Sequence, residues 1–262
     1  MKMKRLLLTI TAILASSLMI GQEAKPPAHE WSYIGKEGPQ HWGELKPEYA
    51  TCKTGRLQSP IDIRETKKAP LPPLRFDYKP SALKIINNGH SIQVNYAPGS
   101  FIVVGDKHYE LRQFHFHHPS EERIDGSEYP MVIHLVHGDA DGHLAVVAVL
   151  LTSGSADSTI QKLWDNLPKN EGKEETIPGV EINASDLLPQ SRGYYTFEGS
   201  LTTPPCSEGV TWFVLKTPRE ISPNQVKTFA KLYPHNTRPT QLLNERVVSE
   251  SESRTVKAGD NR

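Results

Sequence analysis

Short runs of alternating hydrophobic and polar residues dominate the middle of the chain. The runs rich in β-branched and aromatic residues predict strands over residues 84–86, 91–96, 101–104, 108–117, 131–137 and 144–151. Turn sequences such as Asn87-Asn88-Gly89 separate these runs. Two later runs, residues 193–197 and 209–215, predict further strands. The pattern therefore predicts a β-rich domain built as a meander of short strands.

Only two segments have the pattern of helices. One covers residues 158–166, and the other covers residues 223–232, where Ser222 can cap the helix and Pro223 occupies its first position. The chain contains 21 Pro and 18 Gly in 262 residues, which favours short strands and turns over long helical bundles. Since no internal repeat or linker divides the chain, we expect one domain with both helices on its surface.

Composition excludes two classes of partner. The 30 Lys and Arg residues balance 30 Asp and Glu residues, so the formal net charge is zero. This balance argues against a charge-driven nucleic-acid binder or a polybasic membrane binder. Hydrophobic residues make up 37% of the chain and charged residues 23%, which is typical of a globule with a packed core.

The N-terminus has the pattern of an export signal. Basic residues at positions 2, 4 and 5 precede an apolar run over residues 6–20, as in a secretory signal peptide. A membrane anchor is the alternative, but this run is shorter than the roughly twenty residues needed to span a bilayer. We therefore assign residues 1–22 to a signal peptide, residues 23–248 to the folded domain and residues 249–262 to a polar tail. The expected location is the periplasm or the medium.

The two cysteines, Cys52 and Cys206, both lie in the exported part. An even number of cysteines in an oxidising compartment indicates one disulfide, with two buried thiols as the alternative. We expect the bridge to act as a structural staple.

Histidines form the strongest candidate for chemistry. Alternate residues of a strand share a face, so His115 and His117 would stand side by side, opposite the phenylalanines between them. A third imidazole from a neighbouring strand would complete a three-nitrogen zinc site with one open position. His134 and His137 are both candidates, but their odd separation lets only one of them face the metal.

At this point the sequence resembles the α-class carbonic anhydrases, in particular the exported bacterial ones. The resemblance rests on motifs that follow the family's order over nearly the whole mature chain, at residues 29–33, 38–42, 58–63, 87–90, 113–121, 133–137 and 199–206. It implies a mainly β, single-domain fold with a twisted, mostly antiparallel central sheet, a few short surface helices and a conical cleft for the metal.

The resemblance assigns the metal ligands and the group that orients the nucleophile. It makes His115, His117 and His134 the zinc ligands, and it turns His137 away from the metal as a buried structural residue. Thr202 resembles the residue that accepts a hydrogen bond from zinc-bound hydroxide and donates its own proton to Glu121. This arrangement would orient the hydroxide toward the substrate.

The resemblance also assigns the surroundings of the metal. Thr203 and Gln113 would line a polar side. An apolar wall for carbon dioxide would consist of Val136, Val146, Leu201, Val210 and Trp212. His90 matches the position of the family's proton shuttle. The unperturbed imidazole pKa near 6.5 suits proton exchange at neutral pH. A water network between metal and shuttle would involve Tyr33, Asn88 and Gln93. Cys52 and Cys206 match a disulfide that braces the loop of Thr202.

One position departs from the family pattern. Many members place a Glu two residues before the third ligand, where it accepts the second ring proton of that ligand, and this chain has Val132 there. A backbone carbonyl or water would then have to fix the tautomer of His134. The residues Glu122, Arg123 and His118 are interpreted as solvated turn residues.

The resemblance implies a carbonic anhydrase with one zinc per chain that hydrates carbon dioxide reversibly to bicarbonate and a proton through zinc-bound hydroxide. No nucleic acid and, after processing, no membrane anchor are expected. Exported bacterial relatives are often dimers, so a homodimer is also compatible. Two alternatives remain: a non-catalytic zinc-binding module on the same fold, and a hydrolase that uses the same nucleophile on activated esters.

Overall fold

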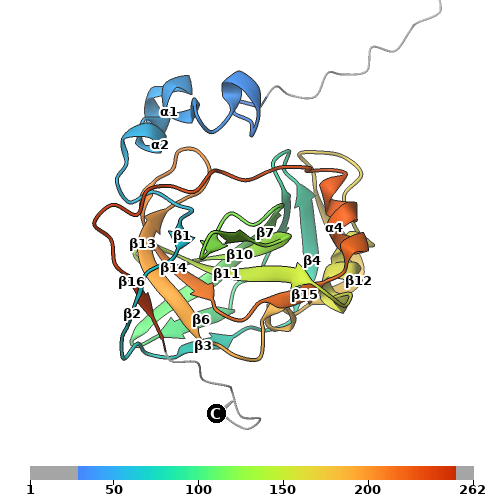
Figure 1. Ribbon diagram of the computed structural model, residues 1–262. Helices are drawn as coiled ribbons and strands as arrows, with labels where there is room; N and C mark the ends of the chain where they lie inside the picture. The colour runs from blue at the N-terminus through green and yellow to red at the C-terminus, as the bar shows by residue number, and fades with distance from the viewer. Residues whose placement is uncertain (1–28, 252–262) are drawn as a thin grey trace, which may run out of the picture.

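A computed structural model describes residues 29–251 and shows a fold dominated by strands (Figure 1). The α-helices in this range are short: α1 (Trp42–Leu45), α2 (Thr51–Thr54), α3 (Ser158–Trp164) and α4 (Pro223–Ala230). The strands are β1 (Asp62–Ile63), β2 (Thr66–Lys68), β3 (Leu74–Asp77), β4 (Ser81–Asn87), β5 (Ile92–Asn95), β6 (Phe101–Val104), β7 (Lys107–His117), β8 (Arg123–Ile124), β9 (Ser127–Glu128), β10 (Met131–Gly138), β11 (Leu144–Ser153), β12 (Glu174–Ile182), β13 (Tyr194–Ser200), β14 (Glu208–Leu215), β15 (Arg219–Ile221) and β16 (Val248–Glu250).

One large sheet organises the described part of the chain. It contains 13 strands, whose main order is β12-β4-β5-β7-β10-β11-β14-β13-β16-β2. Most neighbours are antiparallel, while β11 pairs in parallel with β14 and β15, and β16 pairs in parallel with β2. The predicted fold class, a mostly antiparallel sheet with some parallel pairing, is confirmed. The strands β7, β10 and β11 occupy its centre (Figure 1).

The central strands bury side chains on both faces, as their nearly continuous hydrophobic sequences require. Along β10, Ile133 and Leu135 pack into a large cluster that also contains residues of α3 and α4. Val132 faces the opposite way, into a second cluster with Trp212. Strand alternation therefore gives the sheet two different faces, one occupied by the main core and one that carries the histidine side chains beside a smaller apolar cluster.

Most of the predicted elements are present. The predicted strand over residues 101–104 coincides with β6, and the others differ from their observed strands by a few residues at the ends. The helix α4 begins as predicted, with Ser222 and Gln225 forming a reciprocal capping box. Strand β12 was not predicted, because it is a half-exposed edge strand interrupted by Pro178-Gly179 at a shift of register.

The chain ends differ in part from the prediction. The predicted signal peptide, residues 1–22, lies outside the described residues. The predicted tail begins too early, since Ser249 and Glu250 belong to β16 and Ser251 is buried against Tyr194. The rest of the tail lies beyond the described residues. Within residues 29–251, no helix has the length and apolar character needed to cross a membrane.

The N-terminal segment that carries α1 and α2 lies at one end of the sheet (Figure 1). Cys52 in α2 forms the expected disulfide with Cys206, which closes a loop of 154 residues. In the chain-entropy model, a loop of this size contributes about 5 kcal/mol to the free energy of unfolding. Trp42 and Tyr49 pack around the bridge, so the segment has a small core of its own.

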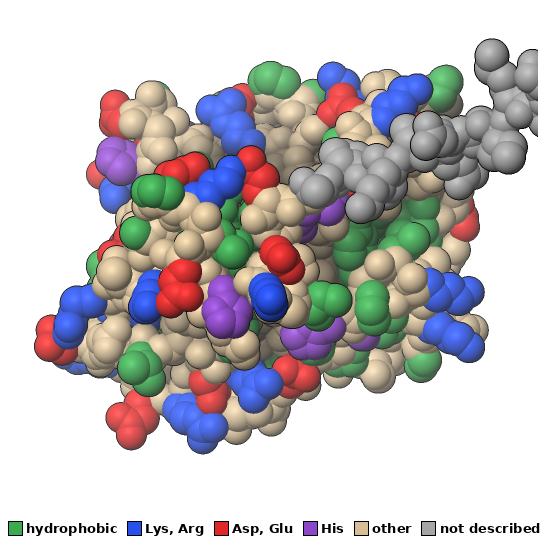
Figure 2. All heavy atoms as spheres, turned by 90° about the horizontal axis from the view of Figure 1, so that it is seen from above, with side chains coloured by type: hydrophobic (Ala, Val, Ile, Leu, Met, Phe, Trp, Pro, Cys, Tyr) green, Lys and Arg blue, Asp and Glu red, His purple; other side chains and the backbone are tan. Residues whose placement is uncertain are grey.

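The same end of the molecule is seen directly in Figure 2. Side chains of both charge signs are interspersed there, and His and hydrophobic side chains lie next to one another at a hollow near the middle (Figure 2). The neutral composition of the sequence is thus reflected on this face by a mixture of charges without a broad area of one sign.

His137 provides a test of the core that is independent of the metal site. Its side chain is fully buried, Nε2 lies 2.7 Å from the hydroxyl of Tyr78, and burial lowers its pKa to about 3. An unfolded histidine has a pKa of about 6.5, so only the unfolded chain binds this proton at mildly acidic pH. Stability supplied by the neutral ring is complete above pH 6.5 and is lost as pH falls toward 3.

We expect His137→Gln, which preserves a partner for Tyr78, to remove this contribution. Between pH 7 and pH 5, the variant should lose about 2 kcal/mol less unfolding free energy than the wild type. Urea unfolding of both proteins at the two pH values measures the difference. An equal loss in both proteins would contradict the assignment of a neutral, buried His137.

Candidate metal centre

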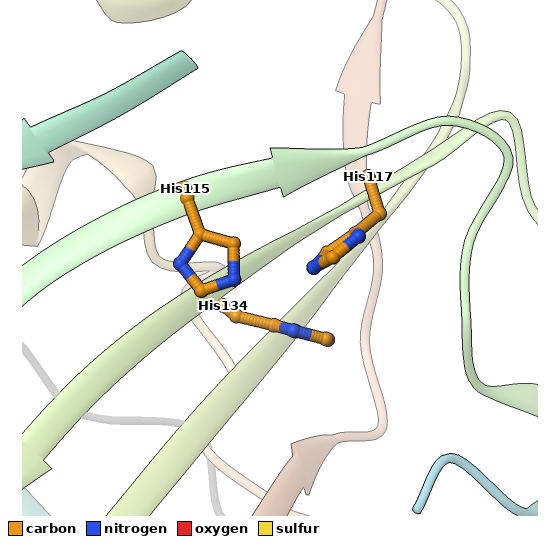
Figure 3. Close-up of side chains that lie close together, drawn as sticks. All are labelled: His115, His117 and His134. Atoms are coloured by element: carbon orange, nitrogen blue, oxygen red, sulfur yellow. The ribbon is translucent and has the colours of Figure 1, made fainter. Parts of the chain in front are cut away.

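Three imidazoles meet where β7 and β10 pair. The register places His134 directly opposite His115, and His117 lies two residues further along the same face of β7. The ring centroids are 4.7 to 5.5 Å apart. The rings point toward one another (Figure 3), and one nitrogen of each lies within 4.8 Å of the others. His137 turns to the opposite face, as expected.

The outer nitrogen of each imidazole has its own hydrogen-bond partner. Nδ1 of His115 lies 2.8 Å from Oε1 of Gln113, and Nδ1 of His117 lies 2.7 Å from the backbone carbonyl of Asn236. Nε2 of His134 lies 2.9 and 3.2 Å from the two carboxylate oxygens of Glu122. Because each partner is an acceptor, the ring protons belong on these outer nitrogens. The inner nitrogens, Nε2 of His115 and His117 and Nδ1 of His134, keep their lone pairs.

The inner nitrogens fit a metal ion. Nε2 of His117 is buried without a hydrogen-bond partner, which is costly unless another group completes it. Three imidazole nitrogens with one direction left open form the donor set of catalytic zinc sites. Burial favours the neutral form of two of the rings, since it lowers the pKa of His115 to about 3 and that of His117 well below its usual value. For His134 the effect of burial is outweighed by the carboxylates of Glu122 and Glu121, which raise its pKa, and a bound cation would oppose their effect. The residues present therefore suit Zn²⁺.

Comparisons with known proteins identify the family of the chain. The family model described as eukaryotic-type carbonic anhydrase matches residues 37–258. The chain belongs to the eukaryotic-type, or α-class, carbonic anhydrase family. A carbonic anhydrase of Nostoc sp. is 45% identical over 240 residues, which cover 90% of this chain and 91% of the relative. The resemblance inferred from the sequence motifs is confirmed.

Solved carbonic anhydrase structures share the fold. A hyperthermostable carbonic anhydrase identified from a hydrothermal vent chimney has a TM-score of 0.82 at 48% identity, covering 85% of this chain and 100% of the other. The α-carbonic anhydrase of Thermovibrio ammonificans, solved with the inhibitor sulfanilamide, has a TM-score of 0.81 at 43% identity, covering 84% of this chain and 98% of the other. In both cases the overlap covers almost the whole of the solved chain.

A buried carboxylate lies beside the three imidazoles, as in the carbonic anhydrase motif. Oε2 of Glu121 lies 3.5 Å from Nε2 of His117 and 3.9 Å from Nδ1 of His134. Oε1 accepts a hydrogen bond from the backbone N–H of Arg238. Burial raises the pKa of Glu121 to about 7, against the opposing effects of His134, the Arg238 N–H and the hydroxyl of Thr202. A divalent cation beside it would favour the ionised form.

The predicted apolar wall is assembled in one place. Val146, Val210 and Trp212 are almost fully buried in the cluster on the histidine face of the sheet, and Val136 and Leu201 pack against them. The indole of Trp212 stands edge-on to His134, with ring centroids 4.9 Å apart. Thr203 is half-buried in the loop before the disulfide. Gln113, expected on the polar lining, contacts the ring of His115.

His90, the expected proton shuttle, is half-buried among aromatic rings. Its ring stacks on Trp31 with centroids 3.7 Å apart, and the ring of His29 stands edge-on at 4.6 Å. Burial, followed by the charge of His29, lowers the pKa of His90 to about 4. The expected water-network residues Asn88 and Gln93 are hydrogen-bonded to each other at 3.3 Å. In this position the imidazole of His90 favours its neutral form.

The sequence interpretation missed two residues of the site. Glu122 was assigned to a solvated turn, but it is fully buried against His134, so this prediction is wrong. Asn236, which holds His117, was not considered, because it lies 119 residues away in sequence. For Glu122, the available signal was its place beside Glu121 at the end of the histidine motif. Arg123 is exposed as expected and pairs with Glu128, but it belongs to strand β8 and not to a turn.

The convergence of three inner nitrogens predicts stoichiometric zinc binding. We expect the purified mature chain to bind about one Zn²⁺. His117→Ala should weaken binding more than about 100-fold, since a lost ligand costs more than a lost outer partner. His108→Ala, an exposed histidine of β7 outside the cluster, is the matched control and should bind normally. Equilibrium dialysis with metal analysis measures both, and equal affinity in the two variants would exclude this site.

Proposed function

We propose that the chain is a zinc-dependent carbonic anhydrase that hydrates carbon dioxide reversibly to bicarbonate and a proton. The observation that carries the proposal is the cluster of His115, His117 and His134, each held by an acceptor at its outer nitrogen. Membership of the carbonic anhydrase family supports the same reaction. Zinc held by three neutral imidazoles lowers the pKa of a bound water to about 7, an effect for which carbonic anhydrase is itself the standard example.

Thr202 and Glu121 are proposed to orient the nucleophile. A threonine hydroxyl can accept one hydrogen bond and donate one. With its proton directed at the Glu121 carboxylate, the Thr202 oxygen can only accept from the nucleophile, so a lone pair of the nucleophile is turned toward the substrate. Glu121 suits this task because it is buried, close to the imidazoles and fixed by the Arg238 N–H. Alignment of this kind lowers the barrier by positioning alone.

Carbon dioxide would be held by apolar contacts. The molecule has no charge and few hydrogen-bonding options, so a hydrophobic wall beside the ligands suits it better than a polar pocket. Val146 and Trp212 are proposed to form the centre of this wall, where they lie on the same face as His134. Bicarbonate, which is charged, would leave this environment for water.

His90 is proposed to carry the released proton to solvent. Stacked on Trp31, its ring has a pKa of about 4 and binds protons poorly at neutral pH. Movement away from the stack would expose the ring to water and return its pKa toward 6.5. In the exposed position the ring can accept the proton released by hydration and pass it on to solvent. The disulfide fits an oxidising compartment, which supports the periplasm or the medium as the location.

Stopped-flow hydration of carbon dioxide tests the proposed reaction. The wild type should be fast, His134→Ala should fall to the buffer rate, and Thr202→Val should lose about 100-fold in kcat/KM, because orientation is lost while the metal stays. His108→Ala serves as the control with wild-type rate. A wild type that binds one zinc and yet hydrates no faster than buffer would reject the enzyme and favour a zinc-binding module.

The shuttle makes a separable kinetic prediction. His90→Ala should lower kcat about tenfold or more and leave kcat/KM unchanged, because proton release follows the hydration step. Added imidazole buffer should restore kcat, while His235→Ala should behave as the wild type. A parallel fall in kcat and kcat/KM, without rescue by imidazole, would assign His90 a structural role.

A further inference from the structure

Glu122 is a buried carboxylate whose two oxygens both face one imidazole. Its side chain has no exposed surface, and the distances from Nε2 of His134 to its oxygens are 2.9 and 3.2 Å. Burying a carboxylate is costly unless a hydrogen-bond donor or a positive charge compensates it. The ring N–H of His134 supplies the donor. Among the hydrogen-bond partners of Glu122, the ring of His134 is thus the one that compensates the buried carboxylate.

The strand of His134 itself offers no polar partner at the neighbouring position on the same face. Val132 is that neighbour, and it is fully buried among apolar side chains such as Ile61 and Val146. The acceptor comes instead from the segment between β7 and β8, twelve residues before His134. The acceptor is thus a side chain from a different part of the chain, and not the backbone carbonyl or water expected from the sequence.

The backbone around Glu122 is fixed by a small separate sheet, β1-β8-β9, on one side and by a turn on the other. The next residue, Arg123, begins β8, and β8 pairs in parallel with β1. The backbone N–H of Arg123 donates to the carbonyl of Ile61 at 3.3 Å. The hydroxyl of Ser120 donates to the carbonyl of Glu122 at 2.8 Å. Both anchors restrict where the carboxylate can lie, which is what a group that orients a ligand requires.

We propose that Glu122 is the positioning residue of the third metal ligand. It holds the proton of His134 on Nε2, keeps the Nδ1 lone pair directed at His115 and His117, and makes that nitrogen a stronger donor. The assignment rests on the proposed zinc site. It also explains how the chain dispenses with a carboxylate at position 132.

The charge of Glu122 distinguishes it from the other two partners. Gln113 and the carbonyl of Asn236 are neutral acceptors for His115 and His117. A carboxylate accepts a stronger hydrogen bond and raises the electron density of the ring. Of the three ligands, His134 should therefore depend most on its outer partner, and loss of Glu122 should weaken zinc binding about 10- to 100-fold.

Zinc affinity measured by competition with a chelator tests the assignment. Glu122→Ala should bind zinc about 10- to 100-fold more weakly than the wild type, and the nearly isosteric Glu122→Gln, which keeps a neutral acceptor, should lie between them. Glu128→Gln, an exposed carboxylate of the adjacent strand β9, is the matched control and should equal the wild type. Wild-type affinity in Glu122→Ala would overturn the proposal.

Imidazole NMR supplies a readout that a merely structural role would not move. In the zinc-loaded wild type and in Glu122→Gln, His134 should show a protected Nε2–H proton, and this signal should exchange rapidly in Glu122→Ala. Persistence of the protected signal in Glu122→Ala would show that another group holds the ring, and would overturn the assignment. Thermal unfolding of each variant verifies that it is folded.

A relocated carboxylate is the final test. The double variant Glu122→Ala with Val132→Glu places the acceptor on the strand of His134 itself, on the same face, and should regain most of the zinc affinity lost in Glu122→Ala. A double variant as weak as Glu122→Ala would overturn the positioning role. Failure of the wild type itself to bind zinc would instead refute the metal site, so the two hypotheses fail separately.

Discussion

The pairing of β7 with β10 is the interaction on which the rest of the site depends. Its register sets His134 opposite His115 and leaves His117 two residues along on the same face. Because both strands lie at the centre of the sheet and their other faces fill the main core, neither can slip by one residue without exposing Phe114, Phe116, Ile133 and Leu135. The hydrophobic side of the sheet thus determines the geometry of the polar side.

A second requirement is that each imidazole of the cluster carries its proton on one defined nitrogen, the outer one. Three chemically different acceptors meet it, namely an amide, a backbone carbonyl and a carboxylate. Each comes from a different part of the chain, while the rings come from two adjacent strands. The ligands are therefore local in the sheet, and their orientation is a property of the whole fold.

This division explains what could be predicted from the sequence. Alternation gave the central strands and the shared face of His115 and His117, and the family motifs selected His134 over His137. Glu122 was not recognised, because its neighbour Arg123 is exposed and no periodic pattern marks a single buried residue outside a strand. The lowered pKa of His90 arises in its stack on Trp31, a contact that no local pattern predicts. Strand β12 is a half-exposed edge strand, and its sequence lacks the alternation of hydrophobic and polar residues that predicts a strand.

The position of Asn236 has a consequence for how the protein acquires its metal. Its carbonyl holds His117 across a separation of 119 residues, and its side-chain amide binds the carbonyls of His90 and Phe116. During synthesis the chain has all three imidazoles long before it has this acceptor. The full affinity of the cluster for a metal ion would therefore require the C-terminal segment to be folded in place.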